Sequence, residues 1–530
     1  MKKNKLLILF VTIFSSIIIT SCHDELDTVP LSTLAPENFF NDVNEAEIAV
    51  NGVYDKMAQH FQQNFIYMSD HGSHVGTIVL NNSNLNMYGW YTYTNSNRFV
   101  TQTWESAYQA IYRANTVINR TTLLDSDDPD KNRVIAEARF LRALVYFNLV
   151  RFYGDVPLVL DELLDLDNKE VTNQSRASSN LVYDAIIDDL LFAEEHLNLA
   201  SWVVDENHPS YDGSNLGRAT VGAAKGLLAK VYLTRASYPI RDLDSYQLAY
   251  DKAKEVINDA HYSLDDDYLN LNSLEGKNSQ EWIFQIQYDV LGEQTSNWGG
   301  IQNPLNEKAG GKKATDWGYG RMSPTFKFAQ SFEDGDPRFQ VIAKGRIKED
   351  NSIQYYNRSK VWFSHKYRFP SQPLSRFNTD MNAPILRFAD VILVYAEAAA
   401  ELGLDNDAHD ALDLILTRAQ NGGSSPALID RSLTGDNLKE FIFWERAREL
   451  CFEGHGKFDI IRAGLDKFLA EVKGQEETTG EGGAVGVDDE RVRLVVHRPV
   501  RLRLEDDAPR RVVLEHRAHA VGHSHKHVCA

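Results

Sequence analysis

The stretch AEARFLRALVYFNLVRFYGDVPLVL, residues 136–160, decides the fold class, because it has the period of a long helix and a clear stop. Apolar residues recur three or four positions apart, which places them on one helical face. They are Ala136, Phe140, Ala143, Leu144 and Phe147. Gly154 and Pro157 then end the helix, since glycine supports the turn after a helix and proline cannot continue one. The stretch therefore predicts a helix that packs one face into a core.

The same helical pattern recurs along most of the chain. In TVGAAKGLLAKVYLTRA, residues 220–236, small residues such as Ala223, Ala224 and Ala229 let neighbouring helices approach closely. Further helical patterns lie after Pro384 and at 43–59, 102–120, 180–197, 245–258, 406–419 and 437–452. Paired helices of this size, with alanine and tyrosine at their contacts, are typical of tetratricopeptide-like hairpins. We therefore predict a mostly α fold on a tetratricopeptide-like helical-hairpin scaffold.

Two sets of residues in these helices have a structural interpretation. Trp104, Tyr108 and Tyr112 are four positions apart, so they form one packing face. Four charged residues on a later helix are expected to form ion pairs within the scaffold. They are Glu445, Arg446, Arg448 and Glu449.

Two stretches interrupt the helical pattern. Residues 61–101 are rich in Asn, Gly, Ser, Thr and Tyr, and residues 262–380 combine short β-like runs, such as WIFQIQY, with glycine-rich loops. Long irregular insertions on a regular scaffold are where binding residues usually lie. We expect these insertions, with their short strands, to form the ligand-binding half of the protein.

The N-terminus has the pattern of an export signal. After a lysine-rich start, residues 6–19 are almost wholly apolar, which is short for a bilayer-spanning helix of about 20 residues. The residues Ile-Thr-Ser-Cys at 19–22 resemble the lipobox of bacterial lipoproteins, in which cleavage leaves the cysteine as a lipid-carrying N-terminus. We expect 1–21 to be a signal peptide, Cys22 to be lipidated and 22–40 to form a tether. The alternative is a short membrane anchor with a chance cysteine.

Composition argues against several classes of function. A formal net charge of −20 argues against binding to nucleic acid or to an anionic membrane surface. The acidic runs at 127–130 and 265–267 lack the glycine and glutamate of an EF-hand loop. We find no nucleotide-binding, metalloprotease or serine-hydrolase signature. Besides Cys22, only Cys451 and Cys529 are present, which is too few for a disulfide framework. We expect no catalytic residue, no cofactor and no metal site.

The last part of the chain differs in composition from the rest. Residues 475–530 contain no Asn, Ile, Phe, Tyr or Trp, and arginine almost completely replaces lysine. The missing residues have AT-rich codons and the abundant ones have GC-rich codons, which indicates a frameshifted or chimeric translation. A segment without large apolar groups can bury little surface. We therefore expect a disordered, non-native tail after a domain that spans 41–474.

Five motifs, taken together, resemble the RagB/SusD family. They are ELDTVPLSTLAPENFFNDVNEAEIAVNGVYDKM, TWESAYQAIYRANTVINR, EARFLRALVYFNLVRFYGDVPLVL, PILRFADVILVYAEAAAELG and WERARELCFEGHGKFDIIRAG. The resemblance covers about residues 22–470 in the family's motif order. Two departures stand out. Gly456 and Lys457 stand where the family often has an arginine–aromatic pair, and the family's usual Pro-Ile-Pro and Asn-Pro-Gly ending is absent.

The resemblance implies a lipid-anchored, surface-exposed outer-membrane protein of Bacteroidetes-type bacteria that is not an enzyme. It implies capture of a glycan and delivery to a SusC-like, TonB-dependent outer-membrane transporter. Two alternatives stay open. The same scaffold serves some relatives for the capture of peptides. A glycoside hydrolase needs only two carboxylates, and a chain with 75 acidic residues cannot be shown to lack such a pair.

The candidate ligand-binding residues lie mainly in the irregular stretches. Sugars present flat C–H faces and a rim of hydroxyl groups, so aromatic rings beside amides, carboxylates and arginines suit them. The segments MYGWYTYTNSN, GEQTSNWGG and DWGYGR carry such sets. The predicted binding residues are Asp70, Trp90, Tyr91, Tyr93, Asn95, Gln294, Trp298, Trp317, Tyr319 and Arg321. For each ring the alternative is that it packs its loop onto the helices.

Overall fold

The structure, a computed structural model, describes most of the chain from residue 39 to residue 473. The described residues are 39–77, 83–89, 91–163, 174–200, 216–289, 295–302, 320–343, 345–347, 353–355, 362–367 and 379–473. Helices dominate this part and the strands are short. The predicted mostly α fold is therefore confirmed. The predicted signal peptide, Cys22 and the predicted tail lie outside the described residues.

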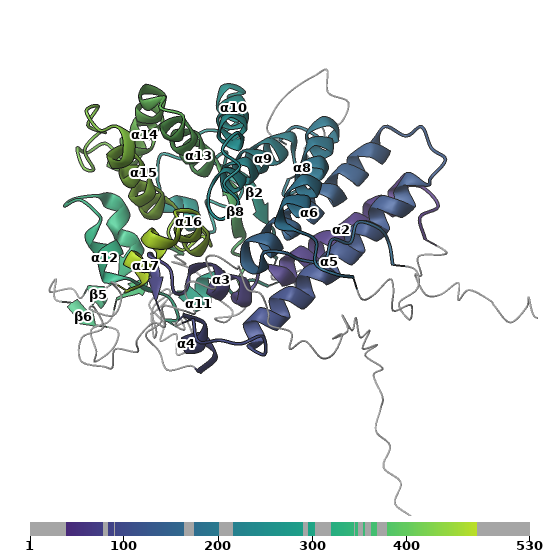
Figure 1. The fold of residues 1–530 in the computed structure, drawn as a ribbon, viewed down its shortest axis with the longest axis horizontal. Helices are drawn as coiled ribbons and strands as arrows, with labels where there is room; N and C mark the ends of the chain where they lie inside the picture. The colour runs from purple at the N-terminus through teal and green to yellow at the C-terminus, as the bar shows by residue number, and fades with distance from the viewer. Residues whose placement is uncertain are drawn as a thin grey trace, which may run out of the picture.

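A row of long helices forms one half of the molecule (Figure 1). In chain order they are α5 (Arg98–Thr122), α6 (Asp130–Tyr153), α8 (Ser179–His196), α9 (Val221–Ala236), α10 (Ser245–Asn258), α13 (Phe388–Glu401) and α14 (Asp405–Gln420). Each helix packs against the next in this order. Helix α2 (Val43–His60) lies on α5 and α6, and α15 (Gly435–Leu450) lies on α13 and α14. This succession of paired helices is the predicted tetratricopeptide-like scaffold.

The local signals in the sequence set the helix ends and contacts as expected. Helix α6 ends at Tyr153, and Gly154 follows with a φ of 68°, a conformation that favours glycine. Helix α9 begins after Thr220, whose side-chain hydroxyl accepts the Ala223 N–H at 3.2 Å. The alanines at 223, 224 and 229 are fully buried, so α9 approaches its neighbours closely on the small faces that the sequence predicted.

A long insertion between α10 and α13 makes most of the other half. Its β2 (Trp282–Ile286) and β8 (Ala383–Arg387) pair antiparallel, so the insertion leaves and rejoins the helices at one ladder. The other strand pairs are also antiparallel. They are β1 (Gly76–Thr77) with β3 (Ser323–Pro324), β4 (Ile342–Ala343) with β7 (Phe363–Ser364), and β5 (Gly345–Ile347) with β6 (Ile353–Tyr355).

Short helices complete this irregular half, which lies below and to the left of the helical row in Figure 1. They are α3 (Gln63–Asp70), α4 (Ser83–Gly89), α11 (Trp298–Gln302), α12 (Phe326–Gln330), α16 (Gly456–Arg462), α17 (Leu465–Lys473) and the 3₁₀ helices η1 (Asn270–Asn272) and η2 (Pro337–Val341). Helix α3 was not predicted, because its last six residues are all buried. A helix buried on every side lacks the one-sided apolar period that reveals a surface helix.

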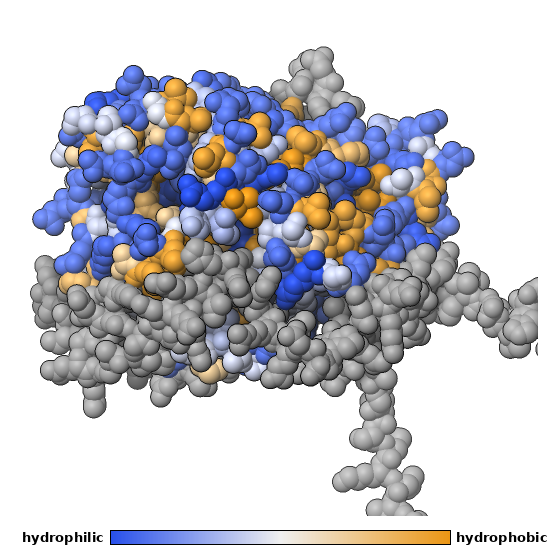
Figure 2. Space-filling view, in the orientation of Figure 1, coloured by the Kyte–Doolittle hydropathy of each residue, from blue (hydrophilic) through white to orange (hydrophobic). Residues whose placement is uncertain are grey.

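The surface over the helical row is mixed. Figure 2 shows hydrophilic residues over much of α10, α13 and α14, with hydrophobic patches among the helices to their right. On α8, Leu181 and Leu191 are exposed. Isolated exposed leucines are normal for a folded protein. Within the described part, no helix combines the length and the apolar composition needed to cross a bilayer.

Candidate functional site

A stacked tyrosine pair lies where α4 ends. The rings of Tyr88 and Tyr93 are 4.8 Å apart between centroids, with 25° between their planes. Tyr88 is buried, and its hydroxyl donates to the Met68 carbonyl at 2.9 Å. Tyr93 is partly exposed, and its hydroxyl makes no hydrogen bond to another described residue. Tyr93 also packs against the hydrophobic core, and burial raises the pKa of its hydroxyl. One ring is thus fixed in the core, and the second lies at the edge of the core with part of its surface exposed.

Polar residues follow Tyr93 in the chain. Asn95 is partly exposed, and its amide makes no hydrogen bond to another described residue. The hydroxyls of Thr94 and Ser96 are 2.8 Å apart on exposed side chains. A flat ring with amide and hydroxyl groups at its edge can stack on the C–H face of a sugar and hydrogen-bond its hydroxyls. We refer to Tyr88, Tyr93 and Asn95 as the tyrosine platform.

Lys457, from a distant segment, and the neighbouring Tyr91 support the tyrosine platform. Lys457 places its ammonium 3.9 Å from the Tyr88 ring centroid and 4.6 Å from the Tyr91 ring centroid. Tyr91 is buried against Phe468, and its hydroxyl donates to the Gly72 carbonyl. Burial lowers the pKa of Lys457 well below its usual value, although Asp70 opposes this shift. Tyr91 was predicted to contact ligand, and its burial makes it a support instead.

Asp70 is also structural, which corrects its prediction as a ligand-binding residue. Its carboxylate is fully buried and accepts the backbone N–H groups of Gly454 at 2.9 Å and Gly456 at 3.0 Å. Burial raises the pKa of Asp70 to about 7, while these two N–H groups favour the charged form. A side chain at position 456 would meet Ser73 Oγ at 2.5 Å, so the loop must carry glycine to approach Asp70.

Trp298 was predicted to bind ligand, and the structure instead buries it, which fits the alternative that the ring packs into the core. Its side chain is fully buried, and its indole N–H donates to the Phe61 carbonyl at 2.8 Å. Its ring lies 6.4 Å from the Phe65 ring and 6.1 Å from the Tyr367 ring. A large apolar ring whose single donor finds a buried carbonyl is most stable in the core, so this indole is not available to stack on a sugar.

The remaining predicted residues have different outcomes. Arg321 is partly exposed, and its positive charge helps to lower the pKa of buried His71, after burial itself and Lys457. It therefore lies near the segment that supports the tyrosine platform. Four predicted residues, Trp90, Gln294, Trp317 and Tyr319, lie outside the described residues.

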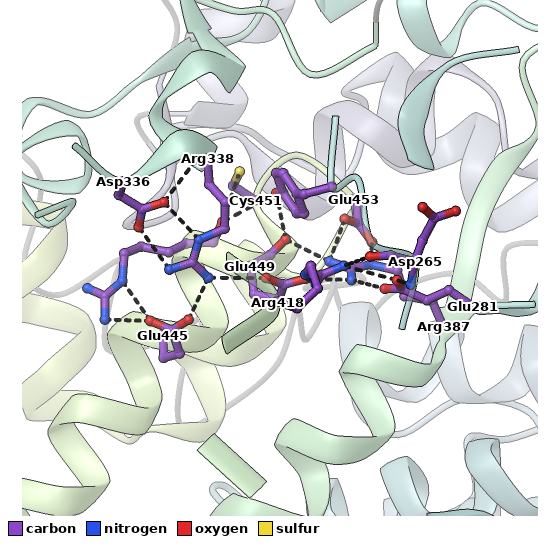
Figure 3. A network of polar contacts seen from close by, with 12 residues as sticks. Asp265, Glu281, Asp336, Arg338, Arg387, Arg418, Glu445, Glu449, Cys451 and Glu453 are labelled. Carbon is purple, nitrogen blue, oxygen red and sulfur yellow. Dashed lines mark hydrogen bonds and ion pairs between the residues drawn. The ribbon is translucent and has the colours of Figure 1, made fainter. Parts of the chain in front are cut away.

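A buried network of charges joins the irregular half to the helices (Figure 3). Glu449 on α15 lies at its centre and accepts from Arg338 at 3.1 Å, from Arg387 at 2.6 Å and from Arg418. Burial alone would raise the pKa of Glu449, but these three arginines hold it well below its usual value. Glu445 of the same helix pairs with Arg338 and Arg448. The predicted ion pairs of this helix are confirmed.

Two described carboxyl groups have a raised pKa, and both are held by partners within the fold. A glycosidase needs one carboxyl with a raised pKa that faces the substrate. Among the described carboxyl groups, the pKa is raised at Asp70 and at Glu137. Asp70 is held by the loop at 453–457, which we call the glycine loop. Glu137 is paired with Arg133 and Arg218. In the same described part, no group of three or more His, Cys, Asp or Glu side chains is arranged to hold a metal ion.

Two family models match the chain. The one described as "Starch-binding associating with outer membrane" matches residues 26–233, and the one described as "SusD family" matches residues 345–489. Together they match more than half of the chain. The chain belongs to the SusD/RagB family. The second match reaches residue 489, so it includes the first residues of the predicted non-native tail.

Individual relatives agree with this family. A SusD-like protein P2 of Formosa agariphila is 28% identical over 500 residues, which cover 88% of this chain and 91% of the relative. A SusD-like protein of Bacteroides ovatus is 27% identical, over 75% of this chain and 72% of the relative. The solved structure of a SusD homolog from Bacteroides thetaiotaomicron is 25% identical and superposes with a TM-score of 0.71, over 86% of this chain and 92% of that one.

A second solved structure supports the fold alone. A structure described as a laminarin-binding SusD-like protein is 22% identical and has a TM-score of 0.66, over 85% of this chain and 97% of that chain.

Sequence reasoning missed Tyr88 and Lys457 as parts of the site. Tyr88 stood in the segment 87–97 that was singled out, and Lys457 stood at a departure from the family motif. Both were visible as residues, but nothing in the sequence showed that they meet.

Proposed function

We propose that this SusD-like protein binds an oligosaccharide or polysaccharide at the tyrosine platform. The observation that carries the proposal is the partly exposed Tyr93 ring, which is stacked on Tyr88 and is followed in the chain by Asn95, whose amide makes no hydrogen bond to another described residue. Two further findings support a glycan as the ligand. One family model is described as starch-binding, and similar structures are titled as laminarin-binding or as a complex with a xylogluco-oligosaccharide.

The proposal extends to location and partner. A family model described as associating with the outer membrane and the lipobox-like sequence that ends at Cys22 support a lipid-anchored protein of the outer membrane. The protein then delivers its glycan to a SusC-like, TonB-dependent transporter. Metabolic labelling with a clickable fatty acid tests the anchor, and equal labelling of wild type and Cys22→Ala would refute it. Extraction in mild detergents followed by pull-down tests the transporter, which should be recovered with the protein.

Substitution of Tyr93 tests the ligand site. Tyr93→Ala should weaken binding by about ten- to a hundred-fold, because a ring that is already ordered loses little entropy when it stacks on a ligand. Binding is measured by titration calorimetry with soluble starch, laminarin and xyloglucan, and melting temperature is measured for each variant. Binding of a peptide library in place of all three glycans would favour the peptide-capture alternative.

A second stacked tyrosine pair provides a matched control. Tyr250 and Tyr395 are 4.7 Å apart with 23° between their planes, almost the geometry of the tyrosine platform. Their hydroxyls, however, bond to each other, and that of Tyr250 also bonds to Asp407. Tyr395→Ala should therefore leave glycan binding unchanged. Equal losses in Tyr93→Ala and Tyr395→Ala would show a general loss of stability and would refute the assignment of the site.

A further inference from the structure

An open groove lies between α12 and α15, away from the tyrosine platform. Its volume is about 620 Å³, which is in the range of small-ligand sites, about 300–1,000 Å³. The groove is lined by residues of α12, of the segment after it, of α15 and by Leu433 just before α15, all within the described part. Figure 1 shows α12, α15 and α17 close together at the left of the molecule. The tyrosine platform, in contrast, follows α4.

Two aromatic rings one helical turn apart form the apolar floor of this groove. Phe441 and Trp444 both lie on α15, and both are partly exposed. The indole N–H of Trp444 donates to Glu440 Oε1 at 2.9 Å, which fixes the ring. The Phe443 ring meets it edge-on at 5.5 Å, and so does the His74 ring at 5.8 Å. The Lys327 and Lys467 ammonium groups lie 5.2 Å and 5.5 Å from the Trp444 ring centroid, and the Arg448 guanidinium lies 5.6 Å from that of Phe441. The Trp444 ring is therefore ordered before any ligand arrives, and a ligand would stack on the part of the ring that these cations leave open.

Amide groups line the same groove. Gln330 comes from the end of α12 and Asn437 from the first turns of α15, and both are exposed. Neither makes a hydrogen bond to another described residue. Each amide offers two donors and one acceptor oxygen, which matches hydroxyl groups that both donate and accept. The groove thus repeats, on different elements, the combination of an ordered ring and free amides that characterises the tyrosine platform.

The charges that line the groove balance. Lys327 and Arg448 face it, and so do Glu333 and Glu440. Lys327 is paired with Glu471 at 2.6 Å, and Arg448 is paired with Glu445 at 2.8 Å. Both cations already have an anionic partner, which reduces their attraction for a carboxylate or sulfate group on a ligand. A neutral ligand rich in hydroxyl groups fits this lining better than an anionic one.

We propose that this groove is a second saccharide site, which binds neutral hexose units of the same chain that the tyrosine platform binds. The inference rests on the proposed function, because it takes the ligand to be a glycan. Two sites on one protein raise the apparent affinity for a long chain through the effective concentration of the second segment. Short oligosaccharides, which cannot reach both sites, occupy each site independently.

Variants of the full-length protein separate the two sites. Wild type is titrated with starch, laminarin and xyloglucan, and with short oligosaccharides of each glycan. Trp444→Ala should halve the stoichiometry for a short oligosaccharide from two to one, and should weaken binding of the long glycan by at least about five-fold. Trp444→Phe keeps a stacking ring and should retain both sites. The double variant Gln330→Ala/Asn437→Ala should weaken saccharide binding at the groove and should leave the packing of the core unchanged.

A neighbouring ring serves as the control. Phe326 is exposed on α12 but does not line the groove, so Phe326→Ala should bind like wild type. Wild-type stoichiometry and affinity in Trp444→Ala, with binding lost in Tyr93→Ala, would overturn the second site and leave the proposed function standing. A stoichiometry of one short oligosaccharide per wild-type protein would also overturn the second site and leave the proposed function standing. No binding of any of the three glycans by wild type would overturn both proposals.

Discussion

Asp70 shows how much a single residue's role depends on residues far from it in the chain. In the sequence it is a polar residue within an irregular stretch, which favours a binding role. In the structure its carboxylate is closed off by two backbone N–H groups of the loop at 453–457. The sequence shows that a carboxylate stands at position 70, but it does not show which donors that carboxylate will meet. The structural role of Asp70 could therefore not be predicted from the sequence.

We predict that Asp70→Asn destabilises the protein. An amide has one acceptor oxygen, so its NH₂ group would face one of the two glycine N–H donors and leave that donor unpaired. Loss of a buried hydrogen-bond partner costs about 1–3 kcal/mol. Urea unfolding of both proteins at pH 7.5 measures the difference. An unchanged midpoint would show that the glycine loop does not depend on this carboxylate.

Trp298→Ala should be a stability variant and not a binding variant. Truncation of a fully buried tryptophan leaves a cavity and costs about 3–5 kcal/mol. The melting temperature should therefore fall by several degrees, while the protein that remains folded binds glycan with wild-type affinity. Tyr93→Ala should show the reverse pattern. A loss of affinity in folded Trp298→Ala would restore this residue to the ligand site.

At the scale of elements, the helices could be predicted and the short pieces between them could not. The pattern at 245–258 matches α10, and the pattern at 43–59 matches α2 to within one residue. Each of these helices packs one apolar face against the core, so the helical spacing of its apolar residues can be recognised in the sequence. Helix α3 is buried on all sides, and strands of two or three residues such as β1 and β5 are set by their partners and not by their own sequences.

Helix α15 is the element on which the buried charges converge, so we predict that Glu449→Gln is strongly destabilising. Its carboxylate meets arginines from η2, β8 and α14 at once. Removing one partner from buried ion pairs leaves uncompensated charges and costs about 3–5 kcal/mol. Denaturant unfolding at neutral pH measures this loss. Lys439→Gln, on the same helix but in a partly exposed pair with Glu401, is the control and should cost about 1 kcal/mol or less.

At the scale of the whole molecule, buried neutral histidines should make the fold sensitive to acid. Burial lowers the pKa of His60 to about 4, and that of His71, His74 and His455 to about 3. Unfolded histidines take up a proton near pH 6.5, so the unfolded state binds more protons between pH 6.5 and these values, and stability falls with falling pH. At pH 5 each histidine should remove about 2 kcal/mol.

Asp70 acts in the opposite sense within the same window. Its folded pKa of about 7 lies above the usual value of 3.8, so its contribution to stability rises as pH falls from 7 toward 4. Burial also raises the pKa of Glu137, which acts in the same sense. The four histidines outweigh these two carboxyl groups, and the urea midpoint should be lower at pH 5 than at pH 7.5. His74→Phe removes one titrating ring beside Phe443 and should flatten this dependence. A midpoint that is equal at both pH values would contradict the prediction.

The bond between Asp70 and Gly454 spans 384 positions of the chain, and this has a consequence for how the protein is made. When residue 70 leaves the ribosome, almost the whole of the remaining domain is still to be synthesised. The N-terminal helices must therefore wait, with a carboxylate that lacks its donors, until the last helices emerge. The N-terminal part can therefore complete its fold only after the last helices have been made. A gene cut anywhere before codon 454 leaves its product without the loop that completes the N-terminal part.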